Sequence, residues 1–170
     1  MKKILVRAGV MVFLGVFLMA GTTFGATGDK TVVLLMIGME SPYCPPYVSN
    51  FTVLLNEKGV KTFMFNAKFD AQLQASQMDD AIAMKPALIV LFAADSQAMA
   101  PGIKKAYDAG IPVLMSNNRP VKESEPYTLA YVGPDYYTQG QLAAEMMNEL
   151  LKGKGKVVMI EGLAGQEAQI

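Results

Sequence analysis

The feature that most constrains the fold is a continuous apolar run at residues 31–38, Thr-Val-Val-Leu-Leu-Met-Ile-Gly. A strand with one face in water alternates apolar and polar side chains, and this run does not, so we expect a strand that is buried on both faces. A second run of this kind, Ala-Leu-Ile-Val-Leu-Phe, occupies residues 87–92. Such strands belong to sheets that carry helices on both sides, which favours an α/β fold.

Helical and strand-like segments alternate along the rest of the chain. Further strands are expected at residues 60–65, 111–115, 129–132 and 156–160, and helices at 50–58, 70–84, 96–109 and 138–151. In the second helix we expect Asp70 to cap the N-terminus and Leu73, Met78 and Ile82 to form the buried face. The strands beginning at 31, 60, 87 and 111 are spaced like βαβ units, which predicts a doubly wound parallel sheet, a Rossmann-like lobe.

Residues 1–26 have the pattern of an export signal. A short basic region with Lys2, Lys3 and Arg7 precedes a 13-residue apolar run at 8–20, and small residues suitable for cleavage follow. The alternative is an uncleaved anchor, but the strongly apolar part is shorter than the ~20 residues of a membrane span. We therefore expect a cleaved signal peptide, a periplasmic location and no stable membrane insertion after cleavage.

Composition excludes several function classes. The chain has 15 Lys+Arg against 15 Asp+Glu and no concentration of basic residues, so nucleic-acid binding is not expected. The absence of histidine and the single cysteine exclude His-based catalytic sites and His or Cys-cluster metal sites. The loop at 38–46 lacks the glycine patterns of nucleotide sites. We expect no catalytic residue, no metal and no cofactor; the alternative, an exported enzyme with Cys44 as nucleophile, has no histidine to activate it.

A doubly wound sheet binds ligands outside the C-terminal ends of its strands. The loops there are expected at residues 39–46, 66–70, 93–96, 116–120 and 133–138. The segment Ser-Asn-Asn-Arg-Pro at 116–120 offers amides that pair with hydroxyl groups and a guanidinium that can bind bidentately. The alternative is an Asn-rich turn with a solvated Arg119. Tyr43 could stack on a sugar ring or cover the sheet edge.

Three segments, 86–99, 106–115 and 153–162, resemble the sugar-type periplasmic binding proteins. These are the type I solute receptors of ABC importers, related to the ligand domains of LacI-type repressors, and the resemblance runs from residue 31 to the last. It implies two α/β lobes that close on a ligand. The chain then divides into a signal peptide (1–26), an N-terminal ligand-binding lobe (27–132), and a hinge crossing with the start of a truncated second lobe (133–170). We expect a fragment of a protein of roughly 300 residues.

The resemblance also implies the ligand-binding positions. They fall on Ser41, Tyr43, Cys44, Asn117, Asn118 and Arg119. Ribose-type members carry Asp-Arg after the fourth strand. This pair aligns either with Asn117-Asn118 or, shifted by one residue, with Asn118-Arg119, and both alignment registers stay open. Asp95 matches a commonly acidic position, although a helix N-terminal role is expected for it. Asp135 falls near the first hinge crossing and is expected to be structural.

The implied function is an exported receptor that captures a small polar ligand, a sugar, and delivers it to an ABC permease. A periplasmic sensory subunit for a chemoreceptor or sensor kinase has the same lobes and is the alternative. A LacI-type repressor is disfavoured because residues 1–26 form a leader where a helix-turn-helix should stand.

Overall fold

The computed structural model describes residues 30–160 and residue 162. The predicted signal peptide lies outside these residues. Five strands form one sheet in the order β2-β1-β3-β4-β5, with every neighbouring pair parallel. The strands are β1 (Thr31–Met36), β2 (Lys61–Asn66), β3 (Leu88–Leu91), β4 (Val113–Ser116) and β5 (Ala130–Val132). The predicted parallel α/β sheet is confirmed.

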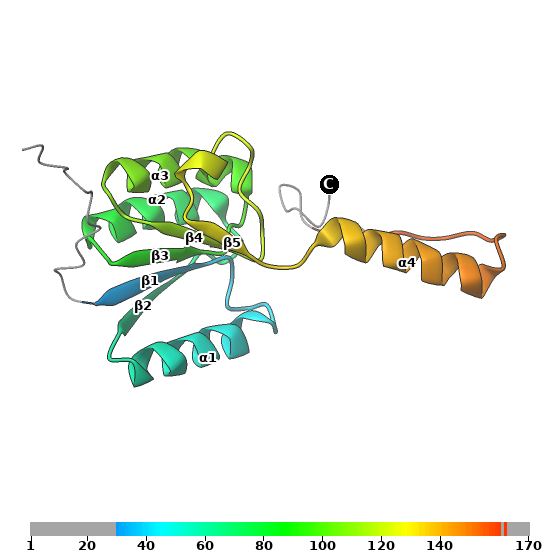
Figure 1. The fold of residues 1–170 in the computed structure, drawn as a ribbon, viewed down its shortest axis with the longest axis horizontal. Coiled ribbons are helices and arrows are strands. Elements are labelled where there is room, and N and C mark those ends of the chain that lie inside the picture. Colours follow the sequence, from blue (N-terminus) through cyan, green and yellow to red (C-terminus); the bar gives the residue numbers. More distant parts are fainter. Residues whose placement is uncertain (1–29, 161, 163–170) are drawn as a thin grey trace, which may run out of the picture.

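Helices cover both faces of the sheet (Figure 1). Helix α1 (Cys44–Glu57) lies on one face, and α2 (Ala71–Ala83) and α3 (Ser96–Asp108) lie on the other. A short 3₁₀ helix (Glu125–Tyr127) precedes β5, and α4 (Tyr136–Leu151) follows it. Helix α1 begins earlier than predicted because Pro45 and Pro46 stand in its first turn, where a missing backbone N–H breaks no helical hydrogen bond.

The side chains of β1 explain its uninterrupted apolar sequence. Val33 and Leu35 pack in a cluster with side chains of α2 and α3. Val32, Leu34 and Met36 pack in a second cluster, on the side of α1. Because successive residues of a strand point to opposite faces, burial of both faces requires an apolar side chain at every position.

The buried face of α2 differs from the predicted one. Gln74, Met78 and Ala81 are buried, whereas Leu73 keeps 38% of its surface exposed and the prediction for it is wrong. Ile82 is partly buried against the core, as expected. The helix turns Gln74 inward because its amide bonds backbone groups at the end of β3.

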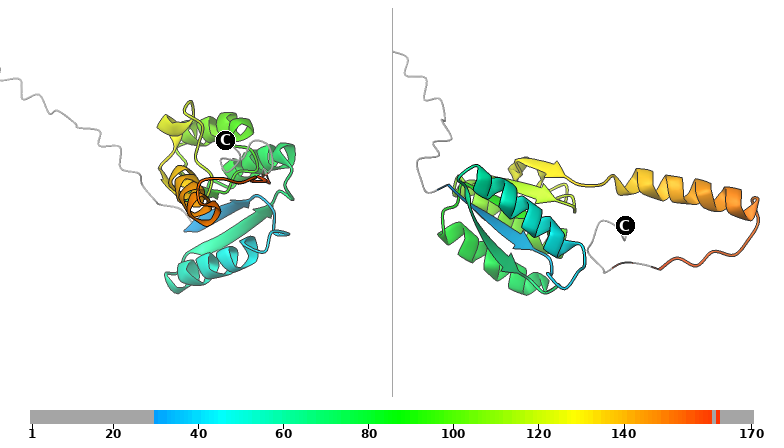
Figure 2. Two further views of the ribbon diagram at one scale, coloured as in Figure 1. Left: turned by 90° about the vertical axis from the view of Figure 1, so that its right-hand side faces the viewer. Right: turned by 90° about the horizontal axis from the view of Figure 1, so that it is seen from below.

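Residues 136–160 extend away from the lobe. Helix α4 has no buried side chain, and the extended residues 154–160 run back along it (Figure 2). The predicted strand at 156–160 is therefore wrong within the described part of the chain, because no strand there lies beside it to accept its hydrogen bonds. Among residues 30–160, no helix combines the length and the apolar character that crossing a membrane requires.

Candidate ligand site

The chain leaves β1 and the neighbouring β3 toward opposite faces of the sheet. The helix that follows β1 is α1, and the helix that follows the adjacent β3 is α3, on the other face. In a doubly wound sheet this switch point, outside the C-terminal ends of the strands, is where ligands bind. The candidate site is therefore the edge formed by the loops after β1, β2, β3 and β4, at residues 37–43, 67–70, 92–95 and 117–120.

The side chain of Asn118 joins the loop after β4 to the loop after β3 by a hydrogen bond. Its side chain is 1% exposed, and its Nδ2 donates to the carbonyl oxygen of Ala93 at 2.8 Å. The hydroxyl of Ser96 donates to the carbonyl oxygen of Arg119 at 2.8 Å. The burial of Asn118 favours an anchoring role over the predicted ligand contact, because its amide donor is already bonded inside the lobe.

Asn117 stands in the left-handed region, with φ 66°, and is half-buried. Its Nδ2 donates to the hydroxyl of Tyr136 at 3.0 Å and lies 3.4 Å from Oδ1 of Asn118. The Tyr131 hydroxyl donates to the carbonyl oxygen of Asn117 at 2.9 Å. A Cβ at Gly133 would collide with that hydroxyl and lie 2.9 Å from the Asn117 Cα, so only glycine leaves room for this turn. These contacts hold the Asn117 carboxamide in place at the sheet edge.

Arg119 is exposed, and its guanidinium carbon lies 4.4 Å from the centroid of the Tyr131 ring. Such a cation–π contact restrains the long side chain. Of the three predicted residues in this loop, Asn117 and Arg119 thus reach the surface and Asn118 does not.

The loop after β1 places its three predicted residues differently. Tyr43 is 53% exposed and Ser41 is half-buried, whereas Cys44 has no exposed surface and packs in the cluster on the α1 side. Burial raises the pKa of the Cys44 thiol, although hydrogen bonds with the Gly38 backbone and the Ser41 side chain oppose the shift. The thiol is therefore neutral at physiological pH. Its placement favours packing over the predicted ligand contact.

Tyr43 is supported by other rings and joined to the loop after β4. Its ring meets Phe92 edge-on at 6.2 Å between centroids and stacks on Tyr47 at 5.9 Å. The Tyr47 hydroxyl lies 2.8 Å from the hydroxyl oxygen of Ser116, the last residue of β4. Burial raises the pKa of Tyr47, which stays protonated at neutral pH even though the bond to Ser116 acts in the other direction. The supports leave about half of the Tyr43 surface open at the edge.

Gln74 and Asn66 position these loops, and neither residue was predicted from the sequence. Gln74 is fully buried; its Nε2 donates to the carbonyl oxygen of Phe92 at 2.9 Å, and its Oε1 accepts from the N–H of Ala94 at 2.7 Å. Asn66 accepts from the N–H groups of Met39 at 3.0 Å and Lys68 at 3.1 Å through one oxygen. The signal for Gln74 was its helical spacing from Met78, which puts both on one face.

Three carboxylates near the edge are helix caps. Asp70, Asp95 and Asp135 each accept backbone N–H groups in the first turn of α2, α3 and α4. The structural roles expected for Asp95 and Asp135 are confirmed. Bonds from the hydroxyl and N–H of Thr138 lower the pKa of Asp135, and the Arg119 charge adds to the shift. Within residues 30–160, no group of three acidic or cysteine side chains is placed to hold a metal ion.

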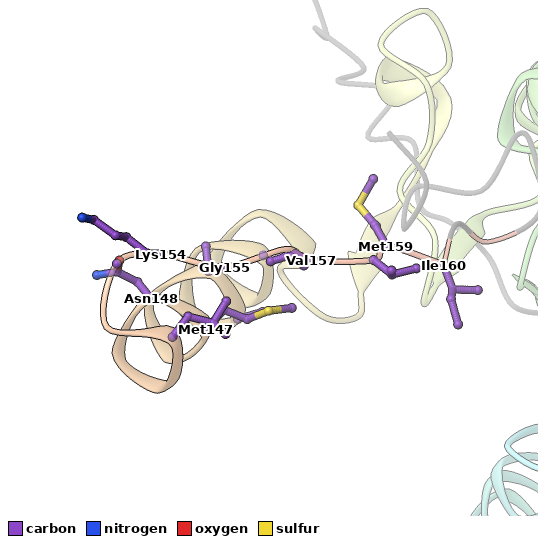
Figure 3. A pocket seen from close by; sticks show the side chains of 13 residues that line it. Met147, Asn148, Lys154, Gly155, Val157, Met159 and Ile160 are labelled. Carbon is purple, nitrogen blue, oxygen red and sulfur yellow. The ribbon is translucent and has the colours of Figure 1, made fainter.

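A hollow of about 650 Å³ lies away from this edge, between α4 and residues 153–160 (Figure 3). Apolar side chains and glycines form most of its wall, including Ala143, Met147, Leu151 and Val157. It carries none of the predicted site residues, and its mostly apolar wall does not suit a polar ligand.

A family model described as "Periplasmic binding protein domain" matches residues 32–170. The chain belongs to this family. The fold is also that of solved periplasmic binding proteins: the Caulobacter myo-inositol binding protein, bound to myo-inositol, superposes with a TM-score of 0.77 at 17% identity, covering 84% of this chain and 48% of that one.

Two relatives extend the match over most of this periplasmic binding protein. A Rhizobium meliloti protein named as rhizopine-binding is 32% identical over 152 residues, covering 88% of this chain and 46% of its own length. The xylitol-binding protein of Mycolicibacterium smegmatis is 30% identical over 151 residues, covering 89% and 42%. The chain thus spans less than half the length of these relatives. Both are named as binding proteins, in agreement with the expectation that this protein is not an enzyme.

Proposed function

We propose that this periplasmic binding protein captures a small polyhydroxylated ligand, a sugar or a related polyol, without covalent chemistry at the C-terminal edge of its sheet. The observation that carries the proposal is the turn at Asn117, where a carboxamide is held at the edge by Tyr136, Asn118 and the Tyr131 hydroxyl. Because Nδ2 already donates to Tyr136 and lies beside Oδ1 of Asn118, the fixed carboxamide offers its Oδ1 as an acceptor for a ligand hydroxyl group.

The other exposed groups suit the same class of ligand. The open face of Tyr43 offers a surface for the C–H side of a sugar, and Arg119 brings a fork of N–H donors. Ser41 lies in the same loop as Tyr43, and Asn118 contacts the turn through its Oδ1, which lies 3.4 Å from Nδ2 of Asn117. The exposure of Asn117 and Arg119 and the burial of Asn118 match neither sequence register as a whole; they support ligand contact by Asn117 from the first register and by Arg119 from the second.

The names of relatives and structural neighbours support a polyhydroxylated ligand. The relatives are named for rhizopine, xylitol, and D-ribose or D-allose. The neighbours are described with galactofuranose, arabinofuranose, glucose, D-fucose and myo-inositol, and one is the binding component of an arabinose ABC transporter. We therefore include delivery to an ABC permease in the proposal, together with export by a cleaved signal at residues 1–26.

The ligand-binding lobe in this proposal is 27–132, and residues 133–170 lead into a second lobe. Helix α4 exposes apolar side chains at intervals of four residues, and the returning chain exposes four in succession: Leu142, Met146, Leu150, Val157, Val158, Met159 and Ile160. Exposed apolar surface of this extent is unfavourable in water, and it marks a surface that another part of a protein covers. A second α/β lobe would supply that cover and the opposite wall of the cleft.

A thermal-shift screen of the complete gene product tests ligand capture. The panel is xylitol, glycerol, D-ribose, D-allose, L-arabinose, D-glucose, D-fucose and myo-inositol. A ligand that binds only the native state stabilises it by RT ln(1 + [L]/Kd), about 2.7 kcal/mol at a hundredfold excess over Kd. We expect at least one compound to raise the melting temperature, and a flat response to all eight contradicts the proposal. Loss of uptake of that compound on deletion of the gene tests delivery to a permease.

A further inference from the structure

The loop after β2 contains a backbone conformation that side chains rarely adopt. Lys68 and Phe69, two successive residues, have φ values of 52° and 62°. The left-handed region is ordinarily reserved for glycine, asparagine and aspartate, and a bulky residue there is an outlier. Outliers of this kind persist where surrounding contacts enforce them, and they gather at functional sites.

Hydrogen bonds to β1 and its following residue enforce this conformation. The N–H of Ala67 donates to the carbonyl oxygen of Met36 at 2.9 Å, and the N–H of Phe69 donates to that of Ile37 at 2.7 Å. The oxygen of Asn66 also accepts the N–H of Lys68. These hydrogen bonds therefore hold the loop at the C-terminal end of β1, a strand beside the switch point.

The fastened loop lays the ring of Phe69 directly over Gly38. A Cβ built on Gly38 would stand 2.6 to 2.9 Å from three carbon atoms of the ring, so the ring occupies the space that any other residue at 38 would need. Part of Phe69 remains open to solvent, since the residue keeps 41% of its surface exposed. An aromatic face is thus presented at the end of β1, at the edge where Asn117 and Tyr43 also lie.

We propose that Phe69 contacts the ligand and selects cyclic sugars and cyclitols over open-chain polyols; this inference rests on the proposed function. A ring-shaped ligand presents several C–H groups on one face, and these pack on the negative face of an aromatic ring. A flexible polyol loses more conformational freedom in forming the same contact. A leucine or methionine in relaxed backbone could cover the strand end equally well, so the strained aromatic points to a role beyond covering it.

Titration calorimetry on the complete gene product tests the inference. The probe is whichever of the eight panel compounds raises the melting temperature most. Phe69→Asn removes the ring and places at 69 a residue that tolerates the left-handed region, whereas Phe69→Tyr keeps the ring. We expect Phe69→Asn to weaken binding about tenfold or more, which corresponds to ~1.4 kcal/mol, and Phe69→Tyr to stay within about threefold. The melting temperature without ligand should change little in Phe69→Asn, because relief of strain offsets the lost packing.

A fluorescence readout covers the case in which Phe69→Asn does not fold. Phe69→Trp introduces tryptophan at the edge of a chain that has none in these 170 residues, and Tyr107→Trp introduces it at an exposed position on α3 as a control. The probe should shift the emission of Phe69→Trp and leave that of Tyr107→Trp unchanged. An unshifted emission in both variants overturns the inference.

The outcomes separate this inference from the proposed function. If the wild type binds no panel compound, the proposed function fails and the role of Phe69 fails with it. If the wild type binds and Asn117→Ala weakens binding while Phe69→Asn stays within twofold, the site stands and Phe69 is only a cover over β1. If xylitol or glycerol is the tightest ligand, the selection for cyclic compounds is wrong.

Discussion

The buried amide of Gln74 should be a large single contributor to the stability of the lobe. The change Gln74→Met keeps the length of the side chain but removes both hydrogen bonds, to the carbonyl oxygen of Phe92 and to the N–H of Ala94. Each of these backbone groups would then be buried without a partner, at about 1–3 kcal/mol apiece. The more favourable burial of the methionine returns part of this loss, so we expect the free energy of unfolding to fall by about 2–4 kcal/mol.

Urea unfolding, followed by circular dichroism, measures this change. A lower midpoint with an unchanged slope would show that stability fell without a change in the surface exposed on unfolding. Gln72→Met is the matched control, since Gln72 is exposed on the same helix and should shift the free energy by no more than about 0.5 kcal/mol. Ligand affinity should also fall in Gln74→Met, because the segment that Gln74 holds carries the Ala93 carbonyl that anchors Asn118. A Gln74→Met protein as stable as the control would refute this reasoning.

Three further outcomes follow from the structure. The Cys44 thiol is buried and its pKa is raised, so it should react with a disulfide reagent at pH 8 far more slowly in the native protein than in urea; equal rates would show that the thiol is accessible. Because the pKa of Cys44 is higher in the folded than in the unfolded protein, its contribution to stability is complete below the unfolded pKa and is lost as the pH rises through the folded pKa. In the 170-residue polypeptide, amides of residues 31–132 should exchange with deuterium much more slowly than those of α4 and 154–160, which have no buried side chain, and uniform protection would contradict this division. Arg119→Lys should weaken binding about fivefold or more by removing the planar fork of N–H donors, and an unchanged affinity would show that the arginine is merely solvated. Added salt should leave the wild-type affinity nearly unchanged because the ligand is neutral, and a steep fall of affinity with salt would indicate an anionic ligand.

The sheet could be predicted from the sequence because its signals are local. The apolar runs at 31–38 and 87–92 have no polar residue to place in water, and burial on both faces follows directly. Asp70 and Asp95 stand immediately before amphipathic segments, which is where capping residues stand. The start of α1 was predicted too late, since proline pairs often end a helix but are tolerated in a first turn.

The wrong predictions concern positions whose structure depends on contacts with residues distant in the sequence. The apolar segment 156–160 has the composition of a strand, yet strand formation needs a neighbour, and the described residues supply none. Leu73 and Gln74 are neighbours on α2, and Gln74 rather than Leu73 is buried because its amide pairs with the backbone groups of Phe92 and Ala94 after β3. The strand-end rule predicted only a set of loops, and the resemblance added six positions without showing which of them reach the surface. The exposure of Asn117 and the burial of Asn118 depend on the carbonyl of Ala93 and the hydroxyl of Tyr131, which are distant in the sequence.

The central claim is that a fixed carboxamide at the end of β4 holds a polyhydroxylated ligand. Titration calorimetry of the complete gene product with the tightest panel compound, comparing the wild type with Asn117→Ala, tests it most directly. A buried hydroxyl left without its partner costs about 1–3 kcal/mol, so the dissociation constant should rise roughly ten- to a hundredfold. The melting temperature of the unliganded variant should fall by several degrees, because alanine is unfavourable at a φ of 66° and the contacts with Tyr136 and Asn118 are lost, and circular dichroism checks that the variant is folded. An affinity within twofold of the wild type would contradict the claim and leave the loop as no more than a turn.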